Sequence, residues 1–349
     1  MTFSGGHGMN SKRIGKRTAA LQTPPSVLSF ANIGGRMEGQ GPLAKYFDEL
    51  CDDSFFGEKT WEKAEATMQR RVLRRALEQA GLKPGDVDYV LAGDLLNQCI
   101  GSSFGLRDFR VPFYGLYGAC STMGESLSLA SLLIDGGYAD RAAALTSSHF
   151  CTAERQYRMP VPYGSQRTPT AQWTTTAAGC TILGSDGPGP YVTHVTCGRI
   201  VDWGVTDANN MGAAMAPAAY DTLRAHFTAT ATGPEDYDLI VTGDLGLLGH
   251  QIVTDLFRQD GVDMTKNYTD CGLLLYHLEK QDMHAGGSGC GCSAAVFNGY
   301  LLRGLREGRW KHLLFAPTGA LLSPTSSFQG ESIPGICHAV ALSAAKEGV

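Results

Sequence analysis

The chain has 349 residues, of which 43% are hydrophobic and 18% charged, and its formal net charge at pH 7 is −5. This composition is typical of a globular protein with a core large enough for two fused halves. A net negative charge without a long basic run argues against nucleic-acid binding. No apolar run approaches the roughly 20 residues of a membrane helix, and no apolar region follows the basic N-terminus, so we expect neither a membrane span nor secretion.

The ten cysteines are too sparse for a disulfide framework, and we expect free thiols in a reducing compartment. Cys290 and Cys292 form a C-x-C pair inside a glycine-rich stretch. No second pair stands at the spacing of a zinc site, so we predict no metal site. Residues 1–20 are expected to form a flexible, solvated tail.

After the tail, residues 18–60 are rich in glycine and proline and predict loops, with one short strand near residues 26–33. Residues 60–80 carry apolar side chains at helical spacing and are followed by Gly81 and Pro84, which predicts a helix that stops there. Residues 86–98 then predict a buried strand that runs into a Gly-Asp turn.

The next segment contains a cysteine at the junction of a strand and a helix. Residues 111–117 are apolar and aromatic and predict a buried strand, and the residues after Cys120 predict a helix that ends at Gly136-Gly137. Residues 142–148 predict the following strand. A thiol at a helix N-terminus is favoured as thiolate, so the position of Cys120 suits a nucleophile; a packed, inert thiol is the alternative interpretation.

The chain also contains an internal repeat. DYVLAGDLL at residues 88–96 recurs as DLIVTGDLG at residues 238–246, an offset of 150, and an offset of 172 aligns Cys120 with Cys292 and residues 142–148 with 314–320. We therefore predict two pseudo-symmetric α/β halves, residues 21–205 and 206–349, with helices between two sheets. Sites in such folds lie at the C-terminal ends of strands. The residues that this places together are Asp94, Cys120, Asp244, Gly289, Cys290, Thr318 and Gly319.

This arrangement, together with the segment GACSTMGESLSLASLLIDGGYADRAAALTSS, resembles the thiolase and ketoacyl-synthase superfamily. The resemblance implies a layered αβαβα fold and a homodimer formed through an edge strand of the first half, for which residues 111–117 are suited. The strings LAGDLLNQ, SSHFCTAERQYRMPVPYG and TGALLSPTSSFQGESIPGI further resemble a thiolase-like family of the SpoVA spore machinery, which moves dipicolinic acid into the developing spore.

The second resemblance implies a dipicolinate-binding chain that lies on the cytoplasmic side, peripheral to the forespore or spore inner membrane, with SpoVA-type membrane proteins as partners. Calcium is a candidate companion of the ligand, and no other cofactor is implied. Enzymes of the superfamily carry a histidine after the second-half strand and a histidine or asparagine before the second-half helix. Here those positions read Thr242-Gly243-Asp244 and Gly287-Ser288-Gly289, without imidazole or carboxamide. The resemblance therefore implies binding without turnover; an acyltransferase that uses Cys120 and a purely structural subunit are the alternatives.

A planar dicarboxylate needs donors for its carboxylates and a ring to stack on. His149 follows the strand after the Cys120 helix, and Arg155 and Arg158 alternate with Tyr157 and Tyr163. We predict that His149 and these arginines hold one carboxylate and that the helix N-terminus at Cys120 receives the other. The alternative is that His149 is packed and that the arginines are solvated or paired with Glu154.

Overall fold

The computed structural model describes residues 12–157 and 167–346. Its main strands follow one path, β11-β10-β13-β16-β9-β2-β8-β6-β4-β5, in which β9 and β2 are joined only by the pair Tyr191 and Ser26. The path therefore consists of two five-stranded halves. Their strands are β2 (Ser26–Gly35), β4 (Tyr89–Gly93), β5 (Phe113–Gly115), β6 (Arg141–Ser148) and β8 (Ala177–Gly184), and β9 (Tyr191–Thr196), β10 (Leu239–Thr242), β11 (Tyr268–Asp270), β13 (His312–Ala316) and β16 (Ala339–Ser343).

The two halves repeat one topology. In the first, β5, β4 and β6 are parallel and β8 and β2 follow antiparallel; in the second, β11, β10 and β13 are parallel and β16 and β9 follow antiparallel. Because β9 takes the place in the second half that β2 takes in the first, the second half begins before residue 191 and not at residue 206. The sequence placed this boundary too late because β9 lies outside the segments in which the repeat is recognised.

The strand registers also correct the second repeat offset. Tyr89 pairs with Ala142, and Leu239, its counterpart at an offset of 150, pairs with Leu313. Ala142 therefore corresponds to Leu313, one residue before the Leu314 that an offset of 172 predicts. The repeat is real, but the sequence alone misses its register by one residue.

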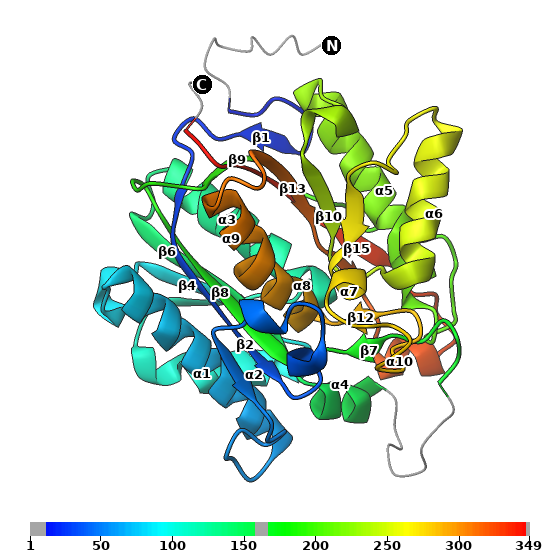
Figure 1. The fold of residues 1–349 in the computed structure, drawn as a ribbon, viewed down its shortest axis with the longest axis horizontal. Coiled ribbons are helices and arrows are strands. Elements are labelled where there is room, and N and C mark those ends of the chain that lie inside the picture. Colours follow the sequence, from blue (N-terminus) through cyan, green and yellow to red (C-terminus); the bar gives the residue numbers. More distant parts are fainter. Residues whose placement is uncertain (1–11, 158–166, 347–349) are drawn as a thin grey trace.

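The helices form three layers around the two halves of the sheet (Figure 1). The helix α1 packs on the outer face of the first half, α5 and α6 lie on the outer face of the second, and α3 and α8 lie between the halves. This is the layered arrangement that the sequence predicted. The helices are α1 (Trp61–Ala80), α2 (Ile100–Leu106), α3 (Thr122–Asp135), α4 (Phe150–Tyr157), α5 (Met211–Thr230), α6 (Gly246–Gln259), α7 (Cys271–Leu274), α8 (Cys290–Val296), α9 (Leu302–Arg306) and α10 (Pro324–Phe328).

The helix α1 illustrates how local sequence sets an element. The side chain of Thr60 accepts a hydrogen bond from the backbone N–H of Lys63, and Gly81 ends the helix in the left-handed conformation at φ 66°. Between these caps, Met68, Val72 and Leu73 are buried against the first half of the sheet. The prediction of a helix over residues 60–80 is confirmed.

The part of the expected tail that the structure describes is not a tail. The strand β1 (Thr18–Ala20) pairs antiparallel with β9, and Lys12 lies 3.0 Å from a carboxylate oxygen of Asp135 on α3. Residues 12–20 are therefore tied to both halves, to the second because β9 leaves an edge for β1 to pair with, and to the first through Asp135. The remainder of the expected tail, residues 1–11, lies outside the described residues.

The aromatic run at residues 111–117 is not a buried strand. It contributes β5, which has three residues and pairs only with β4 at the end of the sheet, and Phe113 and Tyr114 are 40% and 52% exposed. The prediction failed because a run of apolar residues does not reveal whether a second strand covers its far edge. The result is an exposed aromatic sheet edge.

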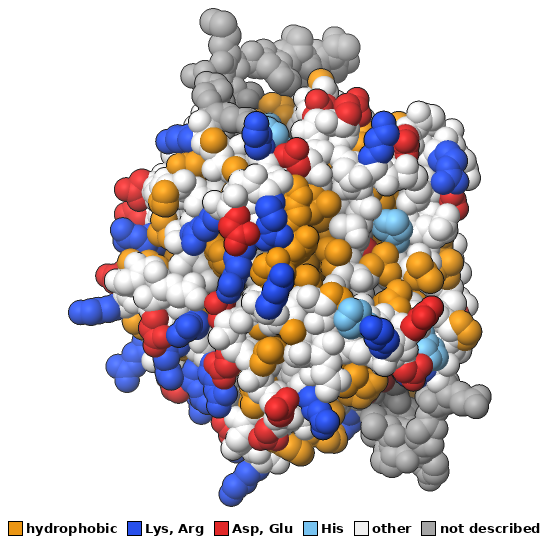
Figure 2. Space-filling model, viewed as in Figure 1, with side chains coloured by type: hydrophobic (Ala, Val, Ile, Leu, Met, Phe, Trp, Pro, Cys, Tyr) orange, Lys and Arg blue, Asp and Glu red, His pale blue; other side chains and the backbone are white. Residues whose placement is uncertain are grey.

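The surface and the thiols agree with the ordinary composition of the chain. Figure 2 shows acidic and basic side chains interspersed on the face that Figure 1 presents, with apolar atoms near its centre. All ten cysteines carry free thiols. Over residues 12–157 and 167–346, none of the helices combines the length and the apolar character needed to cross a bilayer.

Candidate functional site

Cys120 lies at the junction between β5 and the middle-layer helix α3. It belongs to a single 3-10 turn, Ala119–Ser121, directly before α3, and Ala119 takes the left-handed conformation at φ 49°. The hydroxyl of Ser121 donates to the carbonyl of Gly118 at 2.7 Å, and that of Thr122 donates to the carbonyl of Ala119. These bonds hold the turn closed and direct Cys120 toward the second half.

The second half approaches this turn through a glycine. Gly319 belongs to β14 (Thr318–Ala320), and a Cβ atom placed on it would lie 2.3 Å from the carbonyl oxygen of Gly118 and 3.2 Å from the backbone nitrogen of Cys120. Only glycine permits this approach, since a methyl group there would overlap backbone atoms. The sequence prediction that Thr318 and Gly319 lie near Cys120 is therefore matched by the structure.

The carboxyl group of Asp244 lies against the thiol of Cys120. Asp244 follows β10 and is fully buried, and it accepts hydrogen bonds from the backbone N–H of Gly289 at 2.8 Å and from the hydroxyls of Thr318 at 3.1 Å and Ser288 at 3.3 Å. Burial raises the pKa of Asp244 to about 7. One carboxyl group thus joins Cys120 to three residues of the second half.

This neighbour opposes ionisation of the cysteine. Burial raises the pKa of the Cys120 thiol well above its ordinary value, and the negative charge of Asp244 raises it further. The expectation that the helix N-terminus favours thiolate is wrong, because a buried site beside a carboxylate outweighs the partial charge of a helix end. Cys120 is a thiol at neutral pH.

Cys120 also forms part of a narrow pocket. About 440 Å³ of empty space lies between its walls, but only about 40 Å³ is open to the centre of a water molecule. The walls are mostly apolar. Among the lining residues that the structure describes, only Glu154 carries a charged side chain. The lining residues are Leu95, Tyr117, Ala119, Cys120, Ala153, Glu154, Tyr157, Thr174, Met211, Ser288, Ala320 and Leu322.

Two tyrosines form a hydroxyl chain on one wall of this pocket. The hydroxyl of Tyr157 donates to the carbonyl of Leu95 at 2.6 Å, so the proton between the Tyr117 and Tyr157 hydroxyls, which are 2.7 Å apart, comes from Tyr117. Tyr117, Ser288 and Met211 were not among the predicted site residues. Tyr117 and Ser288 stand within the two segments that the sequence singled out, whereas Met211 carries no local signal because it reaches the pocket from α5.

His149 is buried but does not line the pocket. Its Nε2 atom lies 2.7 Å from the carbonyl oxygen of Ser54, and its Nδ1 atom accepts from the backbone N–H of Cys151 at 3.2 Å. Burial lowers the pKa of His149, so the ring is neutral. The prediction that a charged His149 holds a carboxylate is wrong; the ring turns toward the loop before α1, and the alternative of a packed histidine is correct.

The two predicted arginines have different outcomes. Arg155 forms an ion pair with Glu62 and lies over the ring of Trp61, 5.4 Å from its centroid, so it faces the start of α1 and does not line the pocket. Its prediction as a ligand residue is contradicted by this geometry, since sequence spacing cannot show which neighbouring helix a side chain meets. Arg158 and Tyr163 lie outside the described residues.

The remaining predicted residues divide between the pocket and its surroundings. Cys290, at the start of α8, packs against Cys120, and its thiol donates to the carbonyl of Ser147 at 2.9 Å. Gly289 donates to Asp244 from a left-handed conformation at φ 94°. Asp94, by contrast, lies outside the pocket and accepts hydrogen bonds from Leu96 and Ser102. No group of three or more His, Cys, Asp and Glu side chains suited to a metal occurs in the described ranges.

The fold is that of the thiolase-like enzymes. The crystal structure of 3-oxoacyl-[acyl-carrier-protein] synthase III from Aquifex aeolicus VF5 superimposes with a TM-score of 0.57 at 13% identity, covering 91% of this chain and 99% of that one. An OleA variant from Xanthomonas campestris gives 0.58 at 13% identity, with 93% and 99% covered, and human mitochondrial 3-ketoacyl-CoA thiolase gives 0.55 at 12% identity, with 93% and 99% covered.

The particular family is shown by sequence. Residues 15–343 match the family described as Stage V sporulation protein AD (SpoVAD). Stage V sporulation protein AD of Bacillus subtilis (strain 168) is 44% identical over 330 residues, which cover 94% of this chain and 97% of that protein. The chain belongs to the stage V sporulation protein AD family and is a sporulation protein with a thiolase-like fold.

Proposed function

We propose that this sporulation protein binds dipicolinic acid in the Cys120 pocket and does not turn it over. The observation that carries the proposal is the burial of Cys120 beside Asp244, with no imidazole among the described residues of the pocket. Acyl transfer by a thiol needs a thiolate and donors for an oxyanion, and each such donor is worth about 3 kcal/mol of barrier. The described lining offers neither imidazole nor carboxamide, and burial, together with the charge of Asp244, raises the pKa of the Cys120 thiol and favours its protonated form.

The walls suit a flat aromatic ligand better than an acyl chain. Tyr117 and Tyr157 supply aromatic surface. The hydroxyls of Tyr117, Thr174 and Ser288 donate to Tyr157, Glu154 and Asp244 in this structure, and each would turn to a carboxylate of the ligand on binding. Dipicolinate carries two negative charges at neutral pH, and the described walls carry a carboxylate and no cation. A calcium ion that accompanies the ligand would offset this charge, because calcium prefers oxygen ligands and Glu154 stands in the wall.

The Cys120 pocket is narrow and would have to widen for the ligand. The space open to the centre of a water molecule is only about 40 Å³, so we expect α4, which carries Ala153, Glu154 and Tyr157, to shift when the ligand enters. Binding should therefore change the environment of Tyr157. A spectroscopic change at Tyr157 would therefore report binding independently of the heat measured by calorimetry.

Calorimetry tests the proposal directly. We expect dipicolinate to bind, with calcium strengthening the interaction, and Ser288→Ala to weaken it about five- to tenfold, the effect of one hydroxyl donor. Glu154→Gln should reduce the calcium effect and leave calcium-free binding unchanged or stronger. Glu78→Gln, an exposed carboxylate on α1, is the matched control. Absence of binding with and without calcium would leave a purely structural subunit.

The alternative enzyme is tested separately. Cys120 lines a pocket at the start of a helix in a fold shared with acyl-transfer enzymes, which favours an acyltransferase as the second candidate. Mass spectrometry after incubation with acyl-CoA would then find a covalent adduct on Cys120. We expect none.

Assembly and location complete the proposal. We propose that two copies pair through the exposed edge of β5, where Phe113 and Tyr114 stand open, and that the dimer lies on the cytoplasmic face of the spore inner membrane through SpoVA-type membrane proteins. A permanent dimer would bury roughly 2,000 Å² or more. Sedimentation at micromolar concentration should give a dimer and Tyr114→Asp a monomer; a monomeric parent protein would contradict the dimer.

A further inference from the structure

A small hairpin of the second half carries large apolar side chains that stand open to water. Its strands, β14 and β15 (Gly335–Cys337), pair antiparallel, and α10 lies in the segment that joins them. Residues 198–205 lie along the other edge of β15, where Val201 and Gly335 exchange two backbone hydrogen bonds, of 2.9 Å and 2.7 Å. We call residues 198–205 and 318–337 together the hairpin ribbon.

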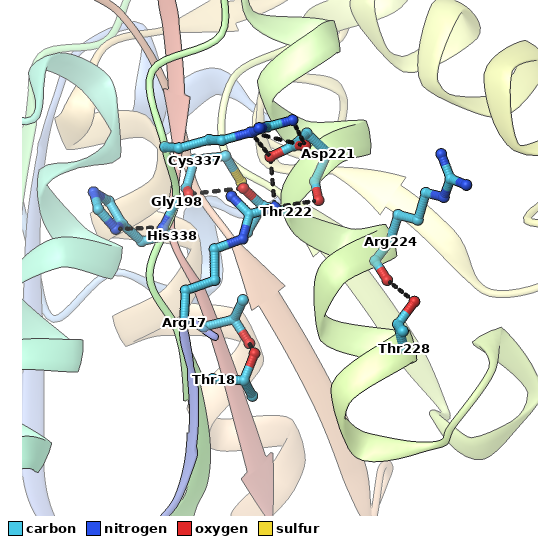
Figure 3. A network of polar contacts seen from close by, with 11 residues as sticks. Arg17, Thr18, Gly198, Asp221, Thr222, Arg224, Thr228, Cys337 and His338 are labelled. Carbon is cyan, nitrogen blue, oxygen red and sulfur yellow. Dashed lines mark hydrogen bonds and ion pairs between the residues drawn. The ribbon is translucent and has the colours of Figure 1, made fainter. Parts of the chain in front are cut away.

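The base of the hairpin ribbon is fixed by polar contacts. Figure 3 shows this base, where the backbone N–H of Gly198 donates to Nδ1 of His338 at 3.3 Å. In the same view the hydroxyl of Thr222 on α5 donates to the carbonyl of Cys337 at 3.0 Å. Both segments of the ribbon are therefore attached where they begin or end.

Hydrogen bonds continue along the ribbon toward α10. The hydroxyl of Ser332 donates to a carboxylate oxygen of Asp202 at 2.5 Å, and the backbone N–H of Ile333 donates to the carbonyl of Val205 at 2.8 Å. The ribbon cannot turn its outer side chains inward without breaking these bonds.

The apolar side chains of the ribbon divide into a packed set and an exposed set. Ile333 and Ile336 are 2% and 8% exposed, and Ile333 belongs to the core that α5 shares with the second half of the sheet. Ile200, Trp203 and Phe328 are instead 64%, 58% and 90% exposed. Holding large apolar side chains in water on a bonded backbone is unfavourable, and such surfaces mark interaction sites.

The charge of the ribbon is acidic toward α10. Asp202 and Glu331 are exposed there, and the hydrogen bond from Ser332 lowers the pKa of Asp202, which is therefore ionised at neutral pH. The one basic residue in 198–205 and 318–337, Arg199, stands at the base, where its guanidinium meets Asp221 of α5 at 2.8 Å. Carboxylates beside exposed aromatic rings attract lysine and arginine side chains, and they repel an anionic lipid surface.

From this arrangement we propose that the hairpin ribbon binds a basic, apolar-rich segment of another protein. Apolar side chains of that segment cover Trp203 and Phe328, and its lysine or arginine side chains pair with Asp202 and Glu331. Residues of the same ribbon line the Cys120 pocket, so the partner lies beside that pocket. The surface is separate from the edge of β5, and its binding does not depend on dipicolinate.

Fluorescence anisotropy with two labelled peptides tests the inference. Both peptides have leucine at helical spacing, and the remaining positions are lysine in one and glutamate in the other. We expect the leucine–lysine peptide to bind and the leucine–glutamate peptide to bind at least tenfold more weakly. Replacing Trp203→Ala and Phe328→Ala together should weaken the leucine–lysine peptide at least tenfold. Tyr138→Ala, which removes a 73% exposed aromatic side chain directly after α3, is the matched control and should leave it unchanged.

A second pair of variants tests the charges. Asp202→Asn with Glu331→Gln should weaken the leucine–lysine peptide about three- to fivefold and reduce the dependence of its binding on salt. Glu78→Gln with Asp108→Asn, two exposed carboxylates of the first half, is the control. All these positions are exposed, and unchanged melting curves would establish that each variant is folded.

Several outcomes would overturn the inference. Absence of binding by both peptides, equal binding of the two, or binding that the Trp203 and Phe328 substitutions leave unchanged would each do so. Vesicles of phosphatidylglycerol that bind the parent protein but not this double variant would show that a lipid surface covers the ribbon. A dimer that Trp203→Asp dissociates would show that a second copy of the chain covers it.

Discussion

Two Gly-Asp turns, one in each half, occupy equivalent places at the ends of β4 and β10, yet they serve different purposes. Asp94 accepts hydrogen bonds from the backbone of Leu96 and from the backbone and hydroxyl of Ser102, all within eight residues of itself. Asp244 instead accepts from Gly289 and Thr318 and meets Cys120, which come from three separate elements. The comparison teaches that a repeated sequence at a repeated strand end specifies the position of a carboxyl group but not its partners.

The surroundings of the two carboxyl groups explain the difference. Asp94 shares its site with Glu65 of α1, whose pKa is raised to about 8 by burial and by the charge of Asp94, and hydroxyls and Gln69 close this site off. At Asp244 the facing middle-layer helix α8 begins directly after Gly289, and Cys120 approaches from the other half. One turn is therefore a structural clamp within its half, and the other joins the halves.

The largest effect should come from removing the clamp. Asp94→Ala leaves the backbone N–H groups of Leu96 and Ser102 buried without acceptors, and we expect the free energy of unfolding to fall by about 3 kcal/mol. Denaturant titration measures this, with the exposed Asp108→Ala as control. A loss no larger than that of the control would mean that Asp94 is not a clamp.

The next effect concerns the pH dependence of the same site. The folded-state pKa of Glu65, about 8, is raised above its ordinary value of 4.5, so the unfolded chain releases this proton first and stability falls as pH rises between these values. Glu65→Gln removes that loss. We expect the variant to gain about 2 kcal/mol over the parent protein between pH 5 and pH 9. Equal changes in the stability of the two proteins between these pH values would contradict it.

A smaller effect should distinguish Asp244 from Asp94 by the reactivity of the Cys120 thiol. Burial and the charge of Asp244 both raise the pKa of Cys120, and Asp244→Asn removes only the charge, so alkylation of Cys120 by iodoacetamide at pH 8 should accelerate about tenfold. Asp94→Asn should leave the rate unchanged. In the parent protein Cys120 should react faster than the fully buried Cys180 and more slowly than the exposed Cys197, which peptide mass spectrometry can follow.

The smallest effect should come from removing a single hydroxyl donor to each of the two aspartates. Thr318→Val removes a donor to Asp244 and Ser102→Ala a donor to Asp94, and we expect each to lower the free energy of unfolding by about 1 kcal/mol. Only Thr318→Val should also alter ligand binding in the Cys120 pocket. If both variants alter it equally, the two turns are not separate in function.

Much of the fold could be predicted from the sequence because its signals are local or periodic. The helix α1 is set by its apolar face and by Thr60 and Gly81, and the repeat identified the two halves. The edge position of β5 and the pairing of β1 with β9 could not be predicted, since both depend on which strands happen to be neighbours. The register of the repeat failed by one residue for a similar reason, because insertions between strands leave no mark in a single sequence.

The sequence by itself determined that Cys120 begins a helix after a strand, and that Asp244 and the Gly287-Ser288-Gly289 segment belong to one edge of the molecule. Only the tertiary structure decided that His149 turns to Ser54, that Arg155 meets Glu62, and that Asp244 faces the thiol. The reason is physical. A strand or helix pattern reports which face of an element is apolar, whereas the partner of a buried polar group is chosen among side chains that packing brings from distant parts of the chain.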